Sequence, residues 1–367
     1  MKVPFADLRS NYLSIKEEID KAISEVIGNS SFIKGHYVSE FEKNFASFCG
    51  SKQAIGVSNG TAALYLALLT AGIKKGDEVI TVPNTFIATT EAISAAGGIP
   101  RFVDVNDYYL MDISKLKEAI NKKTKAIVPV HLHGHIADMP EIIEIAEENN
   151  LKVIEDAAQA HGAGYNGKRS PLSSIACYSF FPAKNLGAFG DAGCVVTNNL
   201  EIAEKIRMLV DHGRTSKYEH AIEGFNHRFD ALQAAILDVK LKYLDKWVEM
   251  RRKNASLYKK NLSQYSKVTL PKEKPHTKHA YHLYVIRTKE RDKLKTHLES
   301  HGIETGIHYP IPLHLQQAYK YLLYNEGSFP QSEQQAKEIL SLPLYPELSE
   351  EQINYVCEKI KDFMNLN

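Results

Sequence analysis

The sequence has few cysteines, and neither sign of charge predominates. Its four cysteines, Cys49, Cys177, Cys194 and Cys357, are scattered over 367 residues and form no CxxC pair or other metal-ligand spacing. We therefore expect reduced, buried thiols and neither disulfide bonds nor a zinc site. The 45 basic and 44 acidic residues give a net charge of +1, so bulk charge gives no support to binding of nucleic acid or of an anionic membrane.

Long apolar runs are also missing. No run approaches the roughly 20 residues that a membrane-spanning helix needs, and residues 1–20 are too polar and charged for a signal peptide. Internal repeats and low-complexity tracts are absent as well. These absences indicate a cytoplasmic globular protein without a membrane partner, and the apolar fraction of 44% is ordinary for that class.

What is present is an alternation of short apolar runs with small-residue or amphipathic helices. The runs lie near residues 54–57, 79–82, 100–105, 126–130 and 152–155. Continuous apolar strands between helices are typical of a mostly parallel sheet covered on both faces. Beyond this α/β region we expect one long helix, over residues 230–262, and then a smaller α+β region. The length favours two domains, which we place at 1–240 and 241–367.

Turns and polar side chains fall where the predicted strands end. Ser58–Thr61 opens a helix and could offer backbone N–H groups to a phosphate, although such a turn alone is more often an ordinary helix cap. Phe86, a histidine cluster and Asp156 follow later strands. Because ligands bind outside the carboxyl ends of strands in open sheets, the convergence of these features favours a phosphate-binding site.

The histidine cluster consists of His131, His133 and His135. Their alternation would place all three on one side of an extended segment. A metal site would need further ligands, but no nearby cysteine or second acidic cluster completes a set. We therefore expect no metal here.

Asp156 and Lys184 are the residues around which a cofactor site can be built. Pyridoxal 5'-phosphate (PLP) needs a lysine for its Schiff base, an acid beside its pyridine nitrogen, donors for its phosphate and a flat group against its ring. Asp156 ends a predicted buried strand, where an unpaired carboxylate would be costly. Lys184 lies between an aromatic segment and a glycine-rich turn, so burial should leave its amine partly neutral. A lone lysine there is more often a surface charge, but the ordered set with Gln159 and Ser179 favours PLP.

Seven motifs, in this order, resemble those of the DegT/DnrJ/EryC1/StrS aminotransferases, which are nucleotide-sugar enzymes of PLP fold type I. They are SNGTAAL (58–64), GDEVITVPNTFIAT (76–89), VPVHLHGHIADM (128–139), VIEDAAQAHGA (153–163), YSFFPAKNLGAFGDAG (178–193), GFNHRFDALQAAIL (224–237) and GIHYPIPLHLQQAY (306–319). The resemblance covers nearly the whole chain. It implies the aspartate-aminotransferase-like α/β fold, with a large PLP-binding domain on a mostly parallel central sheet and a smaller C-terminal α+β domain.

The resemblance also implies roles around the cofactor ring. Lys184 would form the Schiff base with PLP and would be the central catalytic residue. Asp156 would pair with the pyridine nitrogen and Gln159 would bond the ring hydroxyl. Phe86 would stack on the ring.

For the cofactor phosphate, the resemblance implies Gly60, Thr61 and Ser179, joined by Asn226 from the neighbouring subunit. Relatives work as dimers with the active site at the interface. We therefore expect a homodimer with shared active sites.

Four residues are expected on the substrate side. His308 and Tyr309, in the GIHYP segment, are similar to residues that face the sugar nucleotide. His133 stands where relatives often have the tyrosine of HLYG, and His227 where they have the second tyrosine of GYNYR. These departures leave the chemistry intact and bear on the identity of the sugar.

The expected reaction is transfer of an amino group from an amino acid, L-glutamate, to a keto group of a nucleotide-linked sugar. A dTDP-linked 3-keto-6-deoxyhexose is the first expectation, because the HYPIPLHLQQAY segment resembles that of 3-aminating members. A UDP-linked or a 4-keto sugar is the alternative. A PLP-dependent sugar dehydrase would carry histidine in place of Lys184, and a non-catalytic regulatory relative would have lost Lys184 or Asp156.

Overall fold

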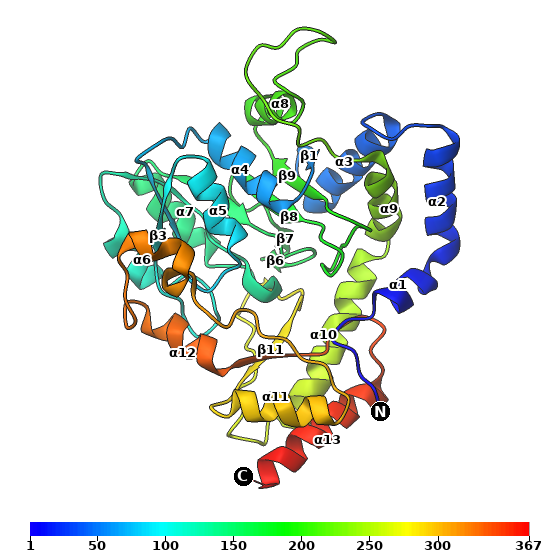
Figure 1. Cartoon of the computed structure of the whole chain (residues 1–367), viewed down its shortest axis with the longest axis vertical. Coiled ribbons are helices and arrows are strands. Elements are labelled where there is room, and N and C mark those ends of the chain that lie inside the picture. Colours follow the sequence, from blue (N-terminus) through cyan, green and yellow to red (C-terminus); the bar gives the residue numbers. More distant parts are fainter. Residues whose placement is uncertain (367) are drawn as a thin grey trace.

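The computed structural model describes residues 1–366 and is built around one seven-stranded sheet (Figure 1). Strand β9 is antiparallel to both its neighbours, and every other neighbouring pair is parallel. The mostly parallel sheet predicted from the apolar runs is therefore confirmed. In spatial order its strands are β1 (Gln53–Val57), β9 (Gly193–Thr197), β8 (Ile175–Ser179), β5 (Lys152–Asp156), β4 (Thr124–Ile127), β2 (Glu78–Thr81) and β3 (Ile99–Phe102).

Helices cover both faces of this sheet (Figure 1). Those on one face are α4 (Gly60–Thr70), α5 (Ala88–Ala95) and α8 (Leu200–Leu209). Those on the other are α3 (His36–Cys49), α6 (Ile113–Ala119), α7 (Met139–Glu148) and α9 (Ala231–Leu241). Successive strand residues point to opposite faces, so Ala54 and Ile55 enter different cores. Burial on both faces is the reason why the strands read as continuous apolar runs.

The predicted functional segments lie at one edge of the sheet. The carboxyl ends of β1, β2, β4, β5 and β8 lie at the same edge, because only β9 runs in the other direction. On β9, Gly193 pairs with Val57 on one side and with Ser179 on the other. The turn after Val57 therefore lies beside Ser179, and Asp156 ends the next strand, β5.

The C-terminal elements have a hydrophobic core of their own. They are α10 (Leu244–Leu262), β11 (Tyr284–Arg287), α11 (Arg291–Ser300), β12 (Ile339–Leu342) and α13 (Glu350–Leu366). Val3 forms a bridge with Ile303 and is buried in the same core, so the first residues of the chain pack with its last third. The predicted boundary between residues 240 and 241 stays a prediction.

One helix predicted as continuous is divided in the structure. The helix expected over residues 230–262 consists of α9 and α10, separated at Lys242 and Tyr243. The break lets α9 pack on the sheet, while Tyr243 stacks on Trp247 with ring centroids 5.8 Å apart and α10 continues into the C-terminal core. Near the N-terminus, α1 (Leu8–Ser14) and α2 (Lys16–Gly28) meet at the buried Ile15.

The start of α13 forms a capping box. The Gln352 N–H donates to Ser349 Oγ at 3.1 Å, and the Ser349 N–H donates to Gln352 Oε1 at 3.0 Å. Within residues 1–366, no helix combines the length and the apolar character that crossing a bilayer would need. The remaining short elements are β6 (Gly164–Tyr165), β7 (Lys168–Arg169), β10 (Thr277–Lys278), α12 (Pro330–Glu338) and the 3₁₀ turns Leu132–Gly134, Leu313–Leu315 and Gln317–Leu322.

Candidate active site

Asp156 places a buried carboxylate at the end of β5. Its Oδ2 accepts a hydrogen bond from Thr89 Oγ1 at 2.7 Å, and its Oδ1 accepts from the Ala158 N–H at 3.1 Å. Burial raises the pKa of Asp156, and these two donors and the charge of Lys184 oppose the rise. A carboxylate offers about four acceptor positions, so Asp156 can accept one more N–H, such as that of a protonated pyridine.

Lys184 lies in a tight turn between β8 and β9. Its N–H donates to the Phe181 carbonyl at 2.8 Å. A Cβ added at Gly187 would lie 2.2 Å from the Pro182 carbonyl oxygen, so the turn is closed too tightly for a larger residue there. Burial lowers the pKa of Lys184 to about 8, and the charge of Asp156 acts in the opposite direction. A useful fraction of the amine is therefore neutral near neutral pH.

A phosphate cradle lies between the turn Ser58–Thr61 and Ser179. The side chain of Asn59 caps α4 by accepting from a backbone N–H three residues on, at 2.8 Å. The N–H groups of Gly60 and Thr61 have no acceptor among residues 1–366. A Cβ added at Gly60 would lie 2.6 Å from that of Ser179, so the two segments touch. Free amides at a helix start beside a hydroxyl are a suitable donor set for a phosphate.

Polar and aromatic side chains line the site beside Asp156. Gln159 Oε1 accepts from the His133 N–H at 2.7 Å, and Gln159 Nε2 donates to the Tyr309 hydroxyl at 3.3 Å. The second hydrogen on Nε2 stays available for the ring hydroxyl of a cofactor. The rings of Phe86 and Tyr309 lie 5.6 Å apart, and Phe86 is 54% exposed. His133 is buried, and its Nε2 donates to the His308 carbonyl at 3.2 Å.

The histidines at 131, 133 and 135 do not have the arrangement that an extended segment would give them. The chain makes a 3₁₀ turn over Leu132–Gly134 instead of extending. As a result, His131 Nε2 donates to the buried Glu155 carboxylate at 2.9 Å, whereas the His135 ring contacts Thr277 Oγ1 at 3.1 Å. Each imidazole of this segment has its own partner.

Asn226 and His227 lie in the loop between α8 and α9, next to the phosphate cradle. The Ser58 N–H donates to the His227 carbonyl at 3.0 Å, and Ser58 Oγ lies 3.2 Å from His227 Nδ1. Backbone pairing with Asp211 anchors Asn226, which remains exposed. The structure thus brings both residues close to the Ser58–Thr61 turn of their own chain.

Two residues of the site were missed from the sequence, Thr85 and Thr89. Thr89 donates to Asp156, and its Oγ1 lies 2.9 Å from that of Thr85. The signal that could have found them is the presence of two threonines four residues apart just before and inside the start of α5, the segment that also carries Phe86.

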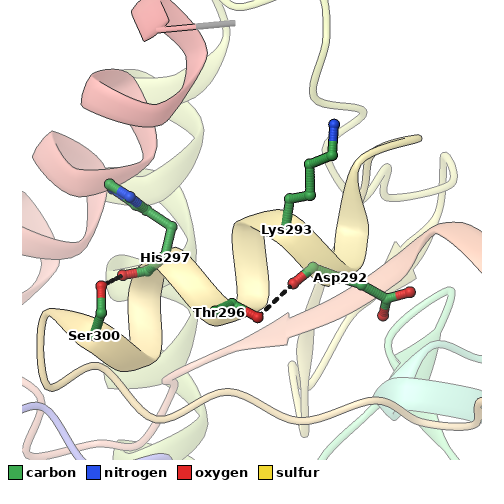
Figure 2. A pocket seen from close by; sticks show the side chains of 5 residues that line it. All are labelled: Asp292, Lys293, Thr296, His297 and Ser300. Atoms are coloured by element: carbon green, nitrogen blue, oxygen red, sulfur yellow. Dashed lines mark hydrogen bonds between the residues drawn. The ribbon is translucent and has the colours of Figure 1, made fainter.

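A hollow elsewhere on the surface adds nothing to this site. Figure 2 shows it on α11, where Thr296 and Ser300 hydroxyls bond to the carbonyls of Asp292 and His297. Four of its five lining residues are exposed, and none belongs to the sheet edge described above. The edge, with its buried acid and lysine, is the chemically equipped site.

Comparison with known proteins agrees with this geometry. The model of the DegT/DnrJ/EryC1/StrS aminotransferase family matches residues 13–361. A "pleiotropic regulatory protein" of Geobacillus stearothermophilus is 48% identical, over 99% of this chain and 99% of its own. The dTDP-3-amino-3,4,6-trideoxy-alpha-D-glucose transaminase of Streptomyces venezuelae is 42% identical, over 99% of this chain and 96% of its own.

A solved structure extends the likeness to three dimensions. The crystal structure of S. venezuelae DesV in complex with a ketimine intermediate superposes with a TM-score of 0.97 at 42% identity, over 99% of this chain and 98% of DesV. The predicted family and fold type are thereby confirmed. The chain belongs to the DegT/DnrJ/EryC1/StrS aminotransferase family.

Proposed function

We propose that this protein transfers the amino group of L-glutamate to the keto group of a dTDP-linked 3-keto-6-deoxyhexose. Its family makes it a PLP-dependent aminotransferase of nucleotide-linked sugars. The observation that carries the site assignment is that Asp156 and Lys184 lie near enough for each charge to shift the pKa of the other group. One is a buried acid with a free acceptor position, and the other is a lysine whose pKa is about 8, at the same sheet edge.

The residues of the site have separate tasks. PLP, when bound, supplies an electron-accepting ring that stabilises charge on the substrate carbon. Asp156 accepts the N–H of the ring nitrogen, and Gln159 donates to the ring hydroxyl. The neutral amine of Lys184 holds the cofactor and then moves a proton to or from the substrate carbon. Phe86 covers one face of the ring and excludes water from it.

The phosphate of the cofactor is held by Gly60, Thr61 and Ser179. Their contact in the structure supports this assignment, because two free amides and a hydroxyl converge there. Asn226 of a second subunit adds a side-chain amide.

His308, Tyr309, His133 and His227 form the substrate side in this proposal. Burial and the charge of Lys184 lower the pKa of His308 to about 4, and burial lowers that of His133 to about 3. Both imidazoles are therefore neutral at physiological pH. Neutral donors and acceptors suit the uncharged hydroxyl groups of a sugar.

The names of the relatives bear on the choice of substrate. The S. venezuelae relative is named for a dTDP-linked 3-amino sugar, which supports a dTDP-linked 3-keto substrate. The G. stearothermophilus relative is named as a regulatory protein. A purely regulatory role does not require a buried acid and a lysine of lowered pKa at one edge, and here both are present.

The reverse reaction tests this function. Purified protein is incubated with 2-oxoglutarate and with each of three amino sugars: a dTDP-linked 3-amino, a dTDP-linked 4-amino and a UDP-linked 3-amino sugar. We expect kcat/KM for the dTDP-linked 3-amino sugar to exceed the others by at least about tenfold, since one well-placed polar contact is worth about that factor. If only the UDP-linked or the 4-amino sugar is turned over, the proposed substrate is wrong and the proposed transamination still stands. Pyruvate in place of 2-oxoglutarate serves as the control acceptor.

A homodimer is part of the proposal. Two large apolar side chains around the site are about half exposed, Phe86 at 54% and Phe181 at 53%. The loop that follows α8 extends away from the body of the chain (Figure 1), and Asn226 is exposed at its base, where it pairs with Asp211. An exposed apolar rim beside a protruding polar loop supports a site completed by a second copy.

Mixed dimers test the shared site. Lys184→Ala removes the lysine of a site, and Asn226→Ala removes the amide donated to the partner's site, so each homodimer should be nearly inactive. A mixed dimer has one site with both residues intact, and we expect up to half of the wild-type activity. Separately tagged subunits, purified as verified heterodimers, provide the measurement, and heterodimers as inactive as the parents would exclude a contribution of Asn226 across the interface.

The lowered pKa of Lys184 predicts the pH dependence of cofactor uptake. Only the neutral amine of Lys184 is nucleophilic, so the rate constant for PLP uptake by apoenzyme should rise with pH. It should level off above about pH 8, well below the ordinary lysine value of 10.5. Asp156→Asn removes the charge that holds this pKa up, so the midpoint should move to lower pH. Stopped-flow absorbance measures both profiles, and a wild-type midpoint above pH 10 would contradict the burial of this amine.

We also propose that the protein works in the cytoplasm. Its four cysteines are all buried free thiols, the state expected in a reducing compartment. Cell fractionation with a cytosolic marker tests the assignment.

A further inference from the structure

Behind Asp156 lies a chain of two buried hydroxyl groups. Thr89 Oγ1 lies 2.7 Å from Asp156 Oδ2, and Thr85 Oγ1 lies 2.9 Å from Thr89 Oγ1. The exposed fractions of Thr85, Thr89 and Asp156 are 3%, 1% and 5%. At this depth bulk water does not compete for the hydrogen bonds, so each hydroxyl is committed to the partners that the protein provides.

The direction of this chain follows from the carboxylate. An ionised carboxylate can only accept, so the Thr89 hydroxyl must donate its single hydrogen to Asp156. Thr89 Oγ1 then has only acceptor positions left, and the Thr85 hydroxyl must donate to it. Each donation polarises the next hydroxyl, which strengthens the bond to the acid.

We propose that Thr85 and Thr89 form a directed hydroxyl relay that holds Asp156 as a charged acceptor for the pyridine nitrogen of PLP. This inference rests on the proposed function, in which Asp156 pairs with that nitrogen. Both threonines are positioning residues, because they act through Asp156 and do not touch the cofactor.

The relay opposes the effect of burial, which favours the neutral form of Asp156. Burial has the largest effect on the pKa of Asp156, which it raises, so it favours the neutral acid. The hydrogen bond from the Thr89 hydroxyl has the largest effect in the other direction and lowers this pKa. The Ala158 N–H and the charges of Lys184 and His131 lower the pKa of Asp156 by smaller amounts. A neutral acid at this position could not hold the ring nitrogen in its protonated form.

The same segment also sets the ring-stacking side chain. Phe86 lies between the two threonines in sequence, and its carbonyl accepts the Thr89 N–H at 3.2 Å. The first turn of α5 thus connects the stacking group to the donor of Asp156. A shift of this turn would disturb both contacts to the ring together.

The test compares two ligands that differ only at the ring nitrogen. Pyridoxamine phosphate binds without a covalent bond to Lys184, and its 1-deaza analogue has C–H in place of the nitrogen. Apoenzyme is titrated with each ligand by fluorescence. Wild type should prefer pyridoxamine phosphate, and Thr89→Val should reduce that preference about tenfold, the usual effect of losing a hydrogen bond to a charged group. Thr85→Val, which leaves the Thr89–Asp156 bond in place, should reduce it about threefold.

Matched variants separate the relay from a general packing role. Thr89→Ser keeps the hydroxyl and should retain the wild-type preference. Thr90→Val removes the neighbouring buried hydroxyl, which bonds to the Ile87 carbonyl at 2.9 Å and not to Asp156, and should also retain it. If Thr89→Val weakens both ligands equally, the relay is overturned, because packing alone would explain the loss. Should Thr89→Val fail to fold, Thr85→Val carries the same comparison.

The outcome also separates the relay from the proposed function. Asp156→Asn should abolish the preference for the ring nitrogen. If Asp156→Asn abolishes it and the two threonine variants leave it at the wild-type ratio, the relay fails and the pairing of Asp156 stands. If wild type shows no preference between the ligands, the pairing of Asp156 itself fails, and the relay fails with it.

Discussion

Lys184→Ala is expected to lower kcat for transamination by at least about 1,000-fold. General acid–base catalysis by one side chain contributes roughly 10²–10⁴-fold, and the variant also loses the amine that holds the cofactor. The purified wild type should be yellow and the variant colourless. Steady-state kinetics with PLP in excess provides the measurement, and a colourless Lys184→Ala protein that still transaminates at the wild-type rate would remove Lys184 from its role.

Chemical labelling can distinguish Lys184 from a second buried lysine, Lys240, which serves as the control. Lys240 is also buried, donates to the Gly187 carbonyl at 2.5 Å, and has a pKa lowered by burial to about 8. A lowered pKa alone would therefore not distinguish the two lysines. Borohydride reduction of the holoenzyme followed by peptide mass spectrometry should place the cofactor on Lys184 and leave Lys240 unmodified, and label on Lys240 would contradict the proposed site.

Asp156→Asn is expected to lower kcat about 100-fold while PLP content stays close to that of wild type. The amide has the shape of the carboxylate but no charge, so the ring nitrogen loses its ionic partner; removing one preorganised electrostatic contact typically costs 10²–10³ in kcat. The phosphate cradle and Lys184 are untouched and should retain the cofactor. Absorbance of bound PLP and single-turnover kinetics measure the two effects separately, and an unchanged turnover would show that Asp156 does not contact the ring.

The neighbouring acid provides the control for Asp156. Glu155 is buried on the opposite side of the strand, where it accepts from His131, from Ser170 Oγ at 2.6 Å and from the Leu172 N–H at 2.6 Å. Its bonds join the strand to a loop and do not reach the site. Glu155→Gln should lower the unfolding temperature, since a buried network loses its charge, and leave kcat per bound PLP near the wild-type value. If instead Glu155→Gln lowers kcat and Asp156→Asn lowers only the unfolding temperature, Glu155 and not Asp156 is the acid of the site.

The order of the elements was predictable because it depends on local patterns. The apolar runs and the helix start at Ser58–Thr61 are both read over a few residues, and the structure confirms them. The division between α9 and α10 was not predictable in this way. Helical periodicity continues through Lys242. The core on the sheet still contains Leu244 and Val248 of α10, and α10 joins the C-terminal core only from Ala255 on, so these contacts are a property of the packed molecule.

By itself the sequence determined the class of chemistry. An acid at a strand end, a lysine in a tight turn and a phosphate turn are short motifs, and their order along the chain sufficed to indicate a PLP enzyme of this family. The tertiary structure alone decided the partner of each side chain. Thr89 and Asp156 are 67 residues apart, and Gln159 and Tyr309 are 150 apart. Hydrogen-bond partners, burial and pKa depend on such long-range contacts, and local periodicity carries no information about them.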